Sequence, residues 1–584
     1  MRLTCIWKWA AGFLVIVTLL ASGPAIGAEQ AGARVPFVTL EAEKSRTNAE
    51  RVFMTDPDRW PPTPAAEASG RAYVELKTAK DSVDFVSPIS ANAIVIRHCV
   101  PDSPDGGGAI ARLRLSVNGA YRQDIQLTSK YSWLYGDGSP WENGQGNTPT
   151  EYSHAYWDEA RFFIPGGIRA GEVIRLQKDP GDTAAYCRID LIDLENVGRP
   201  LSQPPGSLSV LDFGVQPDSE DAETTTQGIQ ACAAAAKAEG KMIWLPPGRY
   251  LLNKRIRLDG VGVQGAGMWH TTVCDTMSGI ATNWGGMAGF TLRGKGASVR
   301  DISMDSLTCT SRKKNWIALV GQAEGWEIRR VWISHTGAAI WIAGTDGVVA
   351  DCRIRNTYAD GININNGQGN TTSNVRVENN HVRGTGDDGL AILCNDNKGN
   401  PASTTKVVMR NNTAVAPWWG ANCDLAGGSE HIVENNLFSD GPGFVINLPP
   451  SFPMKPLSSA IVRNNELIRC GNNLGGQQRG AIWIYPGSTS IRGTFLTGNV
   501  IRSSLYRGIH CAGSEIQEIV FRSNRIVAPG QDAIYIAESV KGSGIFIQNS
   551  VAELSPGRKP LVNRAAKESY HLEEQGNSWR TGRE

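Results

Sequence analysis

The C-terminal half of the chain carries a repeated pattern of polar and apolar positions. Asparagine pairs follow an apolar and a charged residue in Val377-Glu-Asn-Asn380, Met409-Arg-Asn-Asn412, Val433-Glu-Asn-Asn436 and Val462-Arg-Asn-Asn465, and weaker copies end at Asn499 and Asn524. Two residues beyond each copy stands an apolar or small side chain, at Val382, Ala414, Phe438, Leu467, Ile501 and Ile526. Successive copies are 24 to 34 residues apart, which indicates one structural unit per repeat.

This spacing varies too much for a propeller or a leucine-rich repeat, and it suits a parallel β-helix whose loops differ in length. Neighbouring residues of a strand point to opposite faces, so the apolar residues of the repeat face the inside. Asparagine tolerates the left-handed turn conformation and can bond to its counterpart in the next turn. A second apolar strand follows each turn, as in Gly361-Ile-Asn-Ile364 and Ala481-Ile-Trp-Ile484. We therefore predict a right-handed parallel β-helix over residues 209–584.

Two other segments precede the predicted coil. Residues 224–239 are rich in alanine and end at Gly240, which predicts a helix that is capped at its start by threonine and covers the open end of the coil. Between residues 37 and 195, short β-rich runs alternate with Gly/Pro turns, which predicts a β-sandwich over residues 29–198. The Pro- and Ser-containing residues 199–208 are typical of a linker. The chain is thus predicted to be all-β.

The first 28 residues have the pattern of a secretory signal peptide. Arg2 and Lys8 precede an apolar run from Trp9 to Ala21, and small residues follow as far as Ala28. The run is short for a membrane anchor. We expect a secreted protein, extracellular or periplasmic.

The balance of charges and the spacing of the cysteines argue against several classes of ligand. The 58 basic and 57 acidic side chains nearly cancel, which argues against nucleic acid and membrane surfaces. The 11 cysteines are widely spaced without a CxxC motif, so a zinc cluster is not expected, while disulfide pairing stays open. We expect a monomer, and the 17 tryptophans suit contact with sugars.

The candidate chemistry lies in two matching segments of the coil. Asp360-Gly-Ile-Asn-Ile364 and Asp388-Gly-Leu-Ala-Ile392 share one pattern 28 residues apart, so Asp360 should stack over Asp388 with Asp387 beside it. A single Asp-Gly is a common turn. Adjacent carboxylates repel, however, and the glycines at 384, 386 and 389 allow a bent backbone that turns both side chains toward one cleft.

Three aspartates in one patch suit hydrolysis of a glycosidic bond. Strands stack about 4.8 Å apart, so Asp360 and Asp388 could hold one water as paired bases. Asp387 would then be the acid, at a greater distance from that water, with a pKa raised by its neighbours. No catalyst beyond these side chains is required.

Four residues near the aspartates are candidates for substrate contact. They are Tyr358 and Asn363, which flank Asp360, and Trp418 and Trp419 in the next turn. Trp419 is predicted to stack over Asp388, as a platform for a sugar ring. Packing of the tryptophan pair under a loop is an equal alternative.

The motifs Tyr358-Ala-Asp-Gly-Ile-Asn363 and Thr385-Gly-Asp-Asp-Gly389, together with the loop Ser129-Lys-Tyr-Ser-Trp-Leu-Tyr-Gly136, resemble glycoside hydrolase family 87. Its members are α-1,3-glucanases and mycodextranases, which are inverting enzymes with three catalytic aspartates. The resemblance implies that Asp387 is the general acid and that Asp360 and Asp388 activate water. The substrate would be an α-glucan, either α-1,3-glucan or nigeran.

Two further resemblances concern the scaffold. The segment from Asp212-Phe-Gly to Leu245-Pro-Pro-Gly-Arg-Tyr250 resembles the opening of pectate-lyase-like β-helices. Leu40-Glu-Ala-Glu43 and Ile189-Asp-Leu-Ile-Asp-Leu194 resemble the ends of a carbohydrate-binding module of family 35, which implies a structural calcium bound by Glu41, Glu43 and Asp190. The aromatic loop with Trp141 and Tyr156-Trp157 would either bind sugar or pack against the next domain.

Other functions fit parts of the same pattern. Dextranases of family 49 and polygalacturonases share the arrangement of three aspartates on a β-helix. A polysaccharide lyase or epimerase would need a cation near the site, and basic residues are sparse beside Asp360 and Asp388. A non-catalytic, cell-wall-binding β-helix is the remaining alternative.

Overall fold

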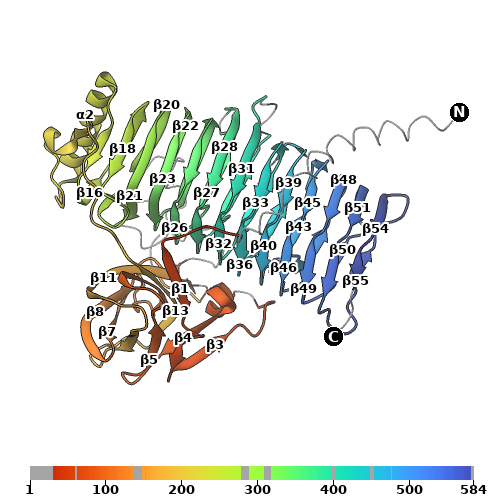
Figure 1. Cartoon of the computed structure of the whole chain (residues 1–584), viewed down its shortest axis with the longest axis horizontal. Coiled ribbons are helices and arrows are strands. Elements are labelled where there is room, and N and C mark those ends of the chain that lie inside the picture. Colours follow the sequence, from red (N-terminus) through yellow and green to blue (C-terminus); the bar gives the residue numbers. More distant parts are fainter. Residues whose placement is uncertain are drawn as a thin grey trace.

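The computed structural model describes residues 31–59, 62–135, 148–151, 153–277, 288–307, 317–367, 369–396, 399, 401–446, 453–474 and 476–579. Two antiparallel sheets come first, and a long coil of parallel strands follows (Figure 1). The predictions of an all-β chain and of a parallel β-helix preceded by a β-sandwich are confirmed. The proposed signal peptide and Trp141 lie outside the described residues.

The sandwich consists of two sheets around an apolar core. One sheet contains β1 (Phe37–Glu41), β3 (Glu50–Phe53), β4 (Ala72–Leu76), β6 (Ala91–Cys99), β11 (Asp158–Ile168) and β13 (Cys187–Glu195). The other contains β2 (Arg46–Thr47), β5 (Ser82–Val86), β7 (Ile110–Val117), β8 (Ala120–Thr128) and β12 (Val173–Lys178). Alternation in β7 puts Leu113, Leu115 and Val117 into the core while the arginines between them face solvent.

The coil has three faces, each a parallel sheet with about one strand per turn. Face 1 includes β26 (Arg353–Arg355), β29 (His381–Arg383), β32 (Thr413–Val415), β36 (Leu437–Ser439), β40 (Glu466–Ile468), β46 (Val500–Arg502) and β49 (Arg525–Val527). Face 2 includes β24 (Ala338–Thr345), β27 (Ile362–Asn365), β30 (Leu390–Leu393), β33 (Cys423–Ala426), β37 (Phe444–Ile446), β43 (Ile482–Ile484), β47 (Ile509–Cys511) and β50 (Ile534–Ile536). Face 3 includes β28 (Thr372–Glu378), β31 (Thr404–Arg410), β35 (Ile432–Glu434), β39 (Ile461–Arg463), β45 (Phe495–Thr497) and β48 (Glu515–Arg522).

The asparagine pairs between face 3 and face 1 have two separate roles. The first member adopts a left-handed conformation, with φ of 56° at both Asn435 and Asn464. The second member is buried and joins a ladder in which Asn436 Nδ2 donates to Asn465 Oδ1 at 2.9 Å and to the Met409 carbonyl at 3.0 Å. The ladder continues in the same way through Asn380, Asn412, Asn499, Asn524, Asn549 and Asn577. Each turn is thereby tied to the next.

Helix α2 (Ala222–Glu239) covers the N-terminal end of the coil, as predicted (Figure 1). Its start differs from the prediction, because Asp221 is the N-cap and accepts a hydrogen bond from the Thr224 N–H at 3.0 Å. Gly240 ends the helix in a left-handed conformation, as expected. Among the described residues no helix is both long and apolar enough to span a membrane.

The nine cysteines that the structure describes are all buried and form no disulfide bonds. Most of them, such as Cys352 and Cys470, belong to the apolar core of the coil. They therefore act as small apolar side chains.

A buried network of charges joins the sandwich to face 1 of the coil. Arg383 pairs with Glu159 at 2.5 Å and with Asp193 at 2.5 Å, and Arg355 pairs with Glu159 at 2.8 Å. Both arginine side chains are almost fully buried. Burial lowers the pKa of Arg383, but the two carboxylates outweigh it and raise this pKa above its usual value. Because burying charges is costly, their mutual pairing holds the two parts in one relative position.

The same interface extends to neighbouring turns. Arg353 makes two hydrogen bonds to Glu195, at 2.6 and 2.8 Å. His335 lies between Asp158 and Asp305, each at 2.7 Å. Burial lowers the pKa of His335, but the two aspartates outweigh it and raise this pKa to about 10. The imidazolium is therefore charged at neutral pH and ties β11 to the coil.

The asparagine ladder generates a stability prediction. Asn436→Ala should lower the free energy of unfolding by about 2–4 kcal/mol, because it leaves buried donors and acceptors of two neighbouring turns unpaired. Arg525→Ala, at an exposed position of β49, should change it by less than about 0.5 kcal/mol. Urea unfolding followed by circular dichroism measures both, and equal effects would show that the ladder contributes nothing specific.

Candidate active site

Asp360 and Asp388 occupy the same position in consecutive turns, just before β27 and β30. The register pairs Ile362 with Leu390, and the Gly361 N–H donates to the Asp388 carbonyl at 2.8 Å. Asp360, Asp387 and Asp388 each place one carboxylate oxygen such that the three atoms lie within 4.8 Å of one another. The structure thus brings together the three aspartates that the sequence indicated. Such a group could hold a water or a cation.

A sharp turn brings Asp387 into this patch. The Thr385 hydroxyl donates to the Asp387 carbonyl at 2.9 Å, just as the Thr357 hydroxyl donates to the Ala359 carbonyl at 2.6 Å one turn earlier. Asp387 therefore takes the position of Ala359. A side chain at residue 386 would lie 1.6 Å from a backbone oxygen of the preceding turn, so only glycine fits there.

Burial makes these carboxylates hard to ionise. It raises the pKa of Asp360 to about 6, although the Asn363 amide donates to this carboxylate at 2.7 Å and lowers the value. Burial also raises the pKa of Asp388 well above its usual value, and the charges of Asp387, Asp424 and Asp360 add to the effect. A base with a pKa near neutrality is well placed for proton transfer.

The exposure of the three aspartates differs. Asp360 and Asp388 are 5% and 6% exposed, whereas Asp387 is only partly buried. The Asp388 carboxylate is held by the Ala421 N–H at 2.7 Å. Asp387 is therefore the member of the group that most readily meets an atom arriving from solvent.

Asp424 is a fourth carboxylate of this cluster, which the sequence reading missed. It is fully buried, and neither of its carboxylate oxygens has a hydrogen-bond partner among the described residues. Burial raises its pKa well above the usual value, and the charges of Asp387 and Asp360 add to this. Its charge in turn acts on Asp388.

Strand alternation in the sequence could have predicted the position of Asp424. The register places it opposite Ala391 of β30. Its strand neighbours Cys423 and Leu425 belong to the core, so alternation turns the aspartate outward on the same face as Asn363. Stacking Cys423-Asp-Leu425 under Leu390-Ala-Ile392 would have revealed it.

Several solved structures share this architecture over almost the whole chain. The Agl-KA catalytic domain gives a TM-score of 0.81 at 23% identity, over 95% of this chain and 100% of that one. A GH87 α-1,3-glucanase from Streptomyces thermodiastaticus strain HF3-3 gives 0.79 at 26% identity, over 94% and 98%. The catalytic domain of a GH87 α-1,3-glucanase in complex with nigerose gives 0.78 at 23% identity, over 94% and 100%. No curated protein matches the chain.

Two family models locate the same relationship in the sequence. The model for α-1,3-glucanase catalytic domain D1 matches residues 34–197, and the model for domain D2 matches residues 222–448. Together the two matches cover more than half of the 584 residues. The chain belongs to glycoside hydrolase family 87. It is therefore a glycoside hydrolase, and its β-sandwich is part of the family's catalytic unit, while a relation to carbohydrate-binding modules of family 35 stays a prediction.

Two of the residues predicted to contact substrate have other contacts in this family 87 chain. Asn363 is fully buried, donates to Asp360 and accepts a hydrogen bond from Asn365 at 2.8 Å, so it positions a carboxylate. Tyr358 is 4% exposed and packs with Leu134 and Tyr156 of the sandwich. Substrate contact by Tyr358 stays a prediction, because its exposure is close to that of Asp360 and Asp388.

The predicted position of Trp419 over Asp388 is wrong. Leu390 pairs with Cys423, 33 residues later, so the residue over Asp388 is Ala421 and not Trp419, which follows Asp388 by only 31 residues. The Trp418 ring stacks on Tyr156 of the sandwich, with centroids 5.4 Å apart. Trp418 therefore packs under the N-terminal module.

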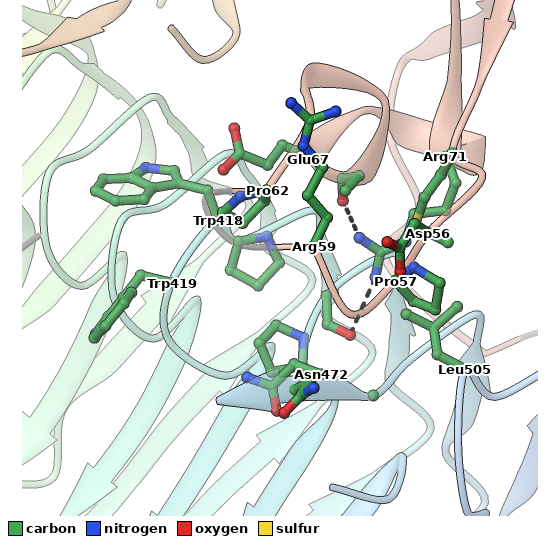
Figure 2. A pocket seen from close by; sticks show the side chains of 17 residues that line it. Asp56, Pro57, Arg59, Pro62, Glu67, Arg71, Trp418, Trp419, Asn472 and Leu505 are labelled. Carbon is green, nitrogen blue, oxygen red and sulfur yellow. Dashed lines mark hydrogen bonds between the residues drawn. The ribbon is translucent and has the colours of Figure 1, made fainter. Parts of the chain in front are cut away.

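Trp419 lies at the edge of a pocket between the sandwich and the coil. Figure 2 shows Trp418 and Trp419 on the left and Asp56, Pro57 and Arg71 of the sandwich on the right. The pocket has a volume of about 70 Å³.

The aromatic loop of the sandwich packs against the coil. Tyr131 stacks on His335 with centroids 3.8 Å apart and donates to the Ser306 carbonyl at 2.7 Å. The Trp133 indole donates to the Val100 carbonyl at 3.2 Å. Of the two alternatives for this loop, the described residues favour domain packing.

The three predicted calcium ligands lie near one another but do not form a closed site. Glu41, Glu43 and Asp190 each have a buried oxygen without a hydrogen-bond partner, which suits a cation. Asp190, however, is paired with Arg97, and the ligand atoms do not all lie within 4.8 Å. Burial raises the pKa of Glu43 to about 7, and the charge of Glu41 adds to it. Calcium here stays a prediction that would require the side chains to shift.

Chelation tests the calcium prediction. If the ion is present, EDTA should lower the melting temperature by several degrees, and added Ca²⁺ should restore it, because the buried carboxylates would then repel each other. Differential scanning calorimetry measures this. An unchanged melting temperature would show that Arg97 alone balances the charge of Asp190.

The burial of Asp424 beside Asp388 generates a pH prediction. Asp424→Asn removes a like charge and so lowers the pKa of Asp388, and the acid limb of the kcat/KM profile should move to lower pH. Activity at the optimum should fall by less than about tenfold, because acid–base groups themselves contribute about 10²–10⁴-fold. Asp532→Asn, at the register position of Asp388 but several turns away, is the control and should leave the profile unchanged. If Asp424→Asn also leaves the kcat/KM profile unchanged, the charge of Asp424 does not act on the pKa of Asp388.

Proposed function

We propose that this chain is a secreted, monomeric enzyme that hydrolyses α-1,3-glucosidic bonds of an α-glucan with inversion of the anomeric carbon. The observation that carries the proposal is the group of three aspartates in a chain of family 87, with oxygen atoms within 4.8 Å of one another. The related enzyme bound to nigerose, whose structure covers almost the same span, supports the choice of substrate.

Each aspartate then has a distinct role. Asp360 and Asp388 hold a water between their buried carboxylates, and one of them accepts its proton. Asp387, the more exposed residue, donates a proton to the glycosidic oxygen. The water oxygen bonds to the anomeric carbon as the bond to the leaving oxygen breaks, so the sugar is released with a new hydroxyl.

The three aspartates are closely spaced. Asp387 is expected to lie farther from the shared water than the two bases do, and one of its oxygens is within 4.8 Å of an oxygen of each base. Inverting enzymes commonly separate acid and base by about 6.5–9.5 Å. The proposal of inversion therefore rests on the family resemblance and on the water that two buried carboxylates can share.

The lyase alternative has less support in the structure. Lyases and epimerases that act on uronates stabilise a carbanion with a nearby cation. Among the described residues, neither Asp360 nor Asp388 forms an ion pair with lysine or arginine, and their polar contacts are with Asn363 and the Ala421 N–H. A neutral sugar at the cleaved bond fits this environment better.

Product analysis tests the proposal. Reducing ends should be released from α-1,3-glucan or nigeran in preference to dextran and polygalacturonate, and NMR should show the β anomer first. Asp387→Asn should fold normally and lose about 10²–10⁴-fold in kcat, because it removes only the transferable proton.

Three outcomes would contradict parts of this proposal. Better release from dextran or polygalacturonate would assign the chain to another linkage. An α anomer as the first product would make one aspartate a nucleophile. Full activity of Asp387→Asn would exclude it as the acid.

A further inference from the structure

Face 2 carries a column of outward-pointing residues that continues from the catalytic turn toward the C-terminus. The column contains Ala391, Asp424, Val445, Trp483, His510 and Tyr535, which pair in register on consecutive strands. The residues that flank these positions within the strands belong to the core, so the column points away from it. The side chains of Ala391, Asp424, Val445 and Trp483 are buried, whereas those of His510 and Tyr535 are partly exposed, so a polymer bound across the aspartates could reach the far end of this column.

The far end of the column holds a cluster of cations and rings, which we call the cationic patch. It consists of Arg479, Arg507, His510, Trp483 and Tyr535. The guanidinium carbon of Arg479 lies 3.9 Å from the centroid of Trp483, and that of Arg507 lies 4.3 Å from the centroid of Tyr535. His510 contacts Tyr535 edge-on at 5.3 Å. The rings hold both guanidinium groups in place.

The cations of the patch lack counter-ions. Within the part of the chain that the structure describes, neither Arg479 nor Arg507 forms an ion pair with a carboxylate, and the Nε of each is buried without a partner. Arg507 donates to the Gln478 carbonyl at 2.7 Å. Asp532 and Arg558 act on Arg507 from nearby, with opposite signs.

The electrostatics agree with this geometry. Burial lowers the pKa of Arg479 to about 10. Burial also lowers the pKa of His510 to about 4, and the charges of Arg507 and Arg479 add to the effect. Half-buried cations without a paired carboxylate are costly, and an anion would relieve that cost.

We propose that the cationic patch binds a carboxylate of an acidic sugar residue in the polymer substrate, several residues away from the cleaved bond. The direction of the polymer along face 2 rests on the proposed function. Guanidinium groups match carboxylates in a planar, two-point geometry, and a ring behind each guanidinium keeps it oriented. The half-exposed Tyr485, stacked on Trp483 at 5.0 Å, offers a surface for the sugar itself.

The distance along the coil explains how an acidic polymer could be cut at a neutral bond. Trp483 lies three strands beyond Ala391 and Tyr535 lies five, which at about 4.8 Å per strand is roughly 14–24 Å. The acidic cluster therefore repels a carboxylate at the cleaved bond, while the patch attracts one farther along. The substrate class becomes an α-glucan chain that carries occasional acidic residues.

Binding of a matched pair of glucans tests the patch. The full chain carrying Asp387→Asn, which prevents hydrolysis, is incubated with neutral α-1,3-glucan and with the same glucan oxidised at C6 to carboxylates, at low and high salt. The oxidised glucan should bind about tenfold more tightly at low salt, and the difference should shrink at high salt. Arg479→Gln and Arg507→Gln should each remove most of this difference and leave binding of the neutral glucan unchanged.

Control variants make the result specific. Arg525→Gln, an exposed arginine on the neighbouring face, should keep the full preference, and Arg479→Lys, which keeps the charge, should keep part of it. Equal binding of the two glucans, or an equal loss in Arg525→Gln, would overturn the proposal. If the wild-type chain releases no sugar from neutral α-1,3-glucan, the proposed function fails, but the binding comparison still decides whether the patch holds carboxylates.

Discussion

The buried ion pairs between the sandwich and face 1 are the interaction on which the rest of the molecule depends. Arg355 and Arg383 end the strands that lead directly into the turns of Asp360 and Asp388, and both arginines are held by Glu159 of the sandwich. A charged group that is buried away from water has no solvent to replace its counter-ion, so each ion pair holds its two partners together. The N-terminal module thus holds the turns that carry the proposed catalytic residues.

Burial shapes the electrostatics of the site. Tyr156 of the sandwich packs with Tyr358 and Trp418 of the coil, next to the turn of Asp360, and Asp360, Asp388 and Asp424 are buried. Ionising several buried carboxylates together is unfavourable, so protons are held near neutral pH by groups that would otherwise lose them far below it. The regular coil around the site, tied together by the asparagine ladder, stabilises the fold and offsets the cost of these buried carboxylates.

On face 2, the regular spacing of the strands sets the positions of the outward-pointing residues along the coil. Each strand adds one outward residue at a near-constant spacing, so a change of residue type along the column is a change of environment along the polymer. The column passes from the carboxylate of Asp424 to the rings of Trp483 and Tyr535, over which Arg479 and Arg507 lie. The proposed preference for a neutral sugar at the cleaved bond and an acidic one farther along follows from this change.

The sequence by itself determined the β-helix, the β-sandwich and the three aspartates, because each depends on local alternation and on a repeat that returns to one register. It also predicted helix α2, although Asp221 and not threonine caps its start. Other features depend on contacts between residues that are far apart in the sequence, and only the tertiary structure specifies these contacts. The register of β30 and β33 puts Ala421, two residues beyond Trp419, over Asp388, and Trp418 stacks on Tyr156, which lies more than 250 positions earlier. Asp190 is paired with Arg97, and burial, to which the charges of Asp387 and Asp360 add, raises the pKa of Asp424. Periodicity specifies which face a side chain takes, but only packing specifies what covers that face, and burial by a distant segment sets the charge and the role of the residue beneath it.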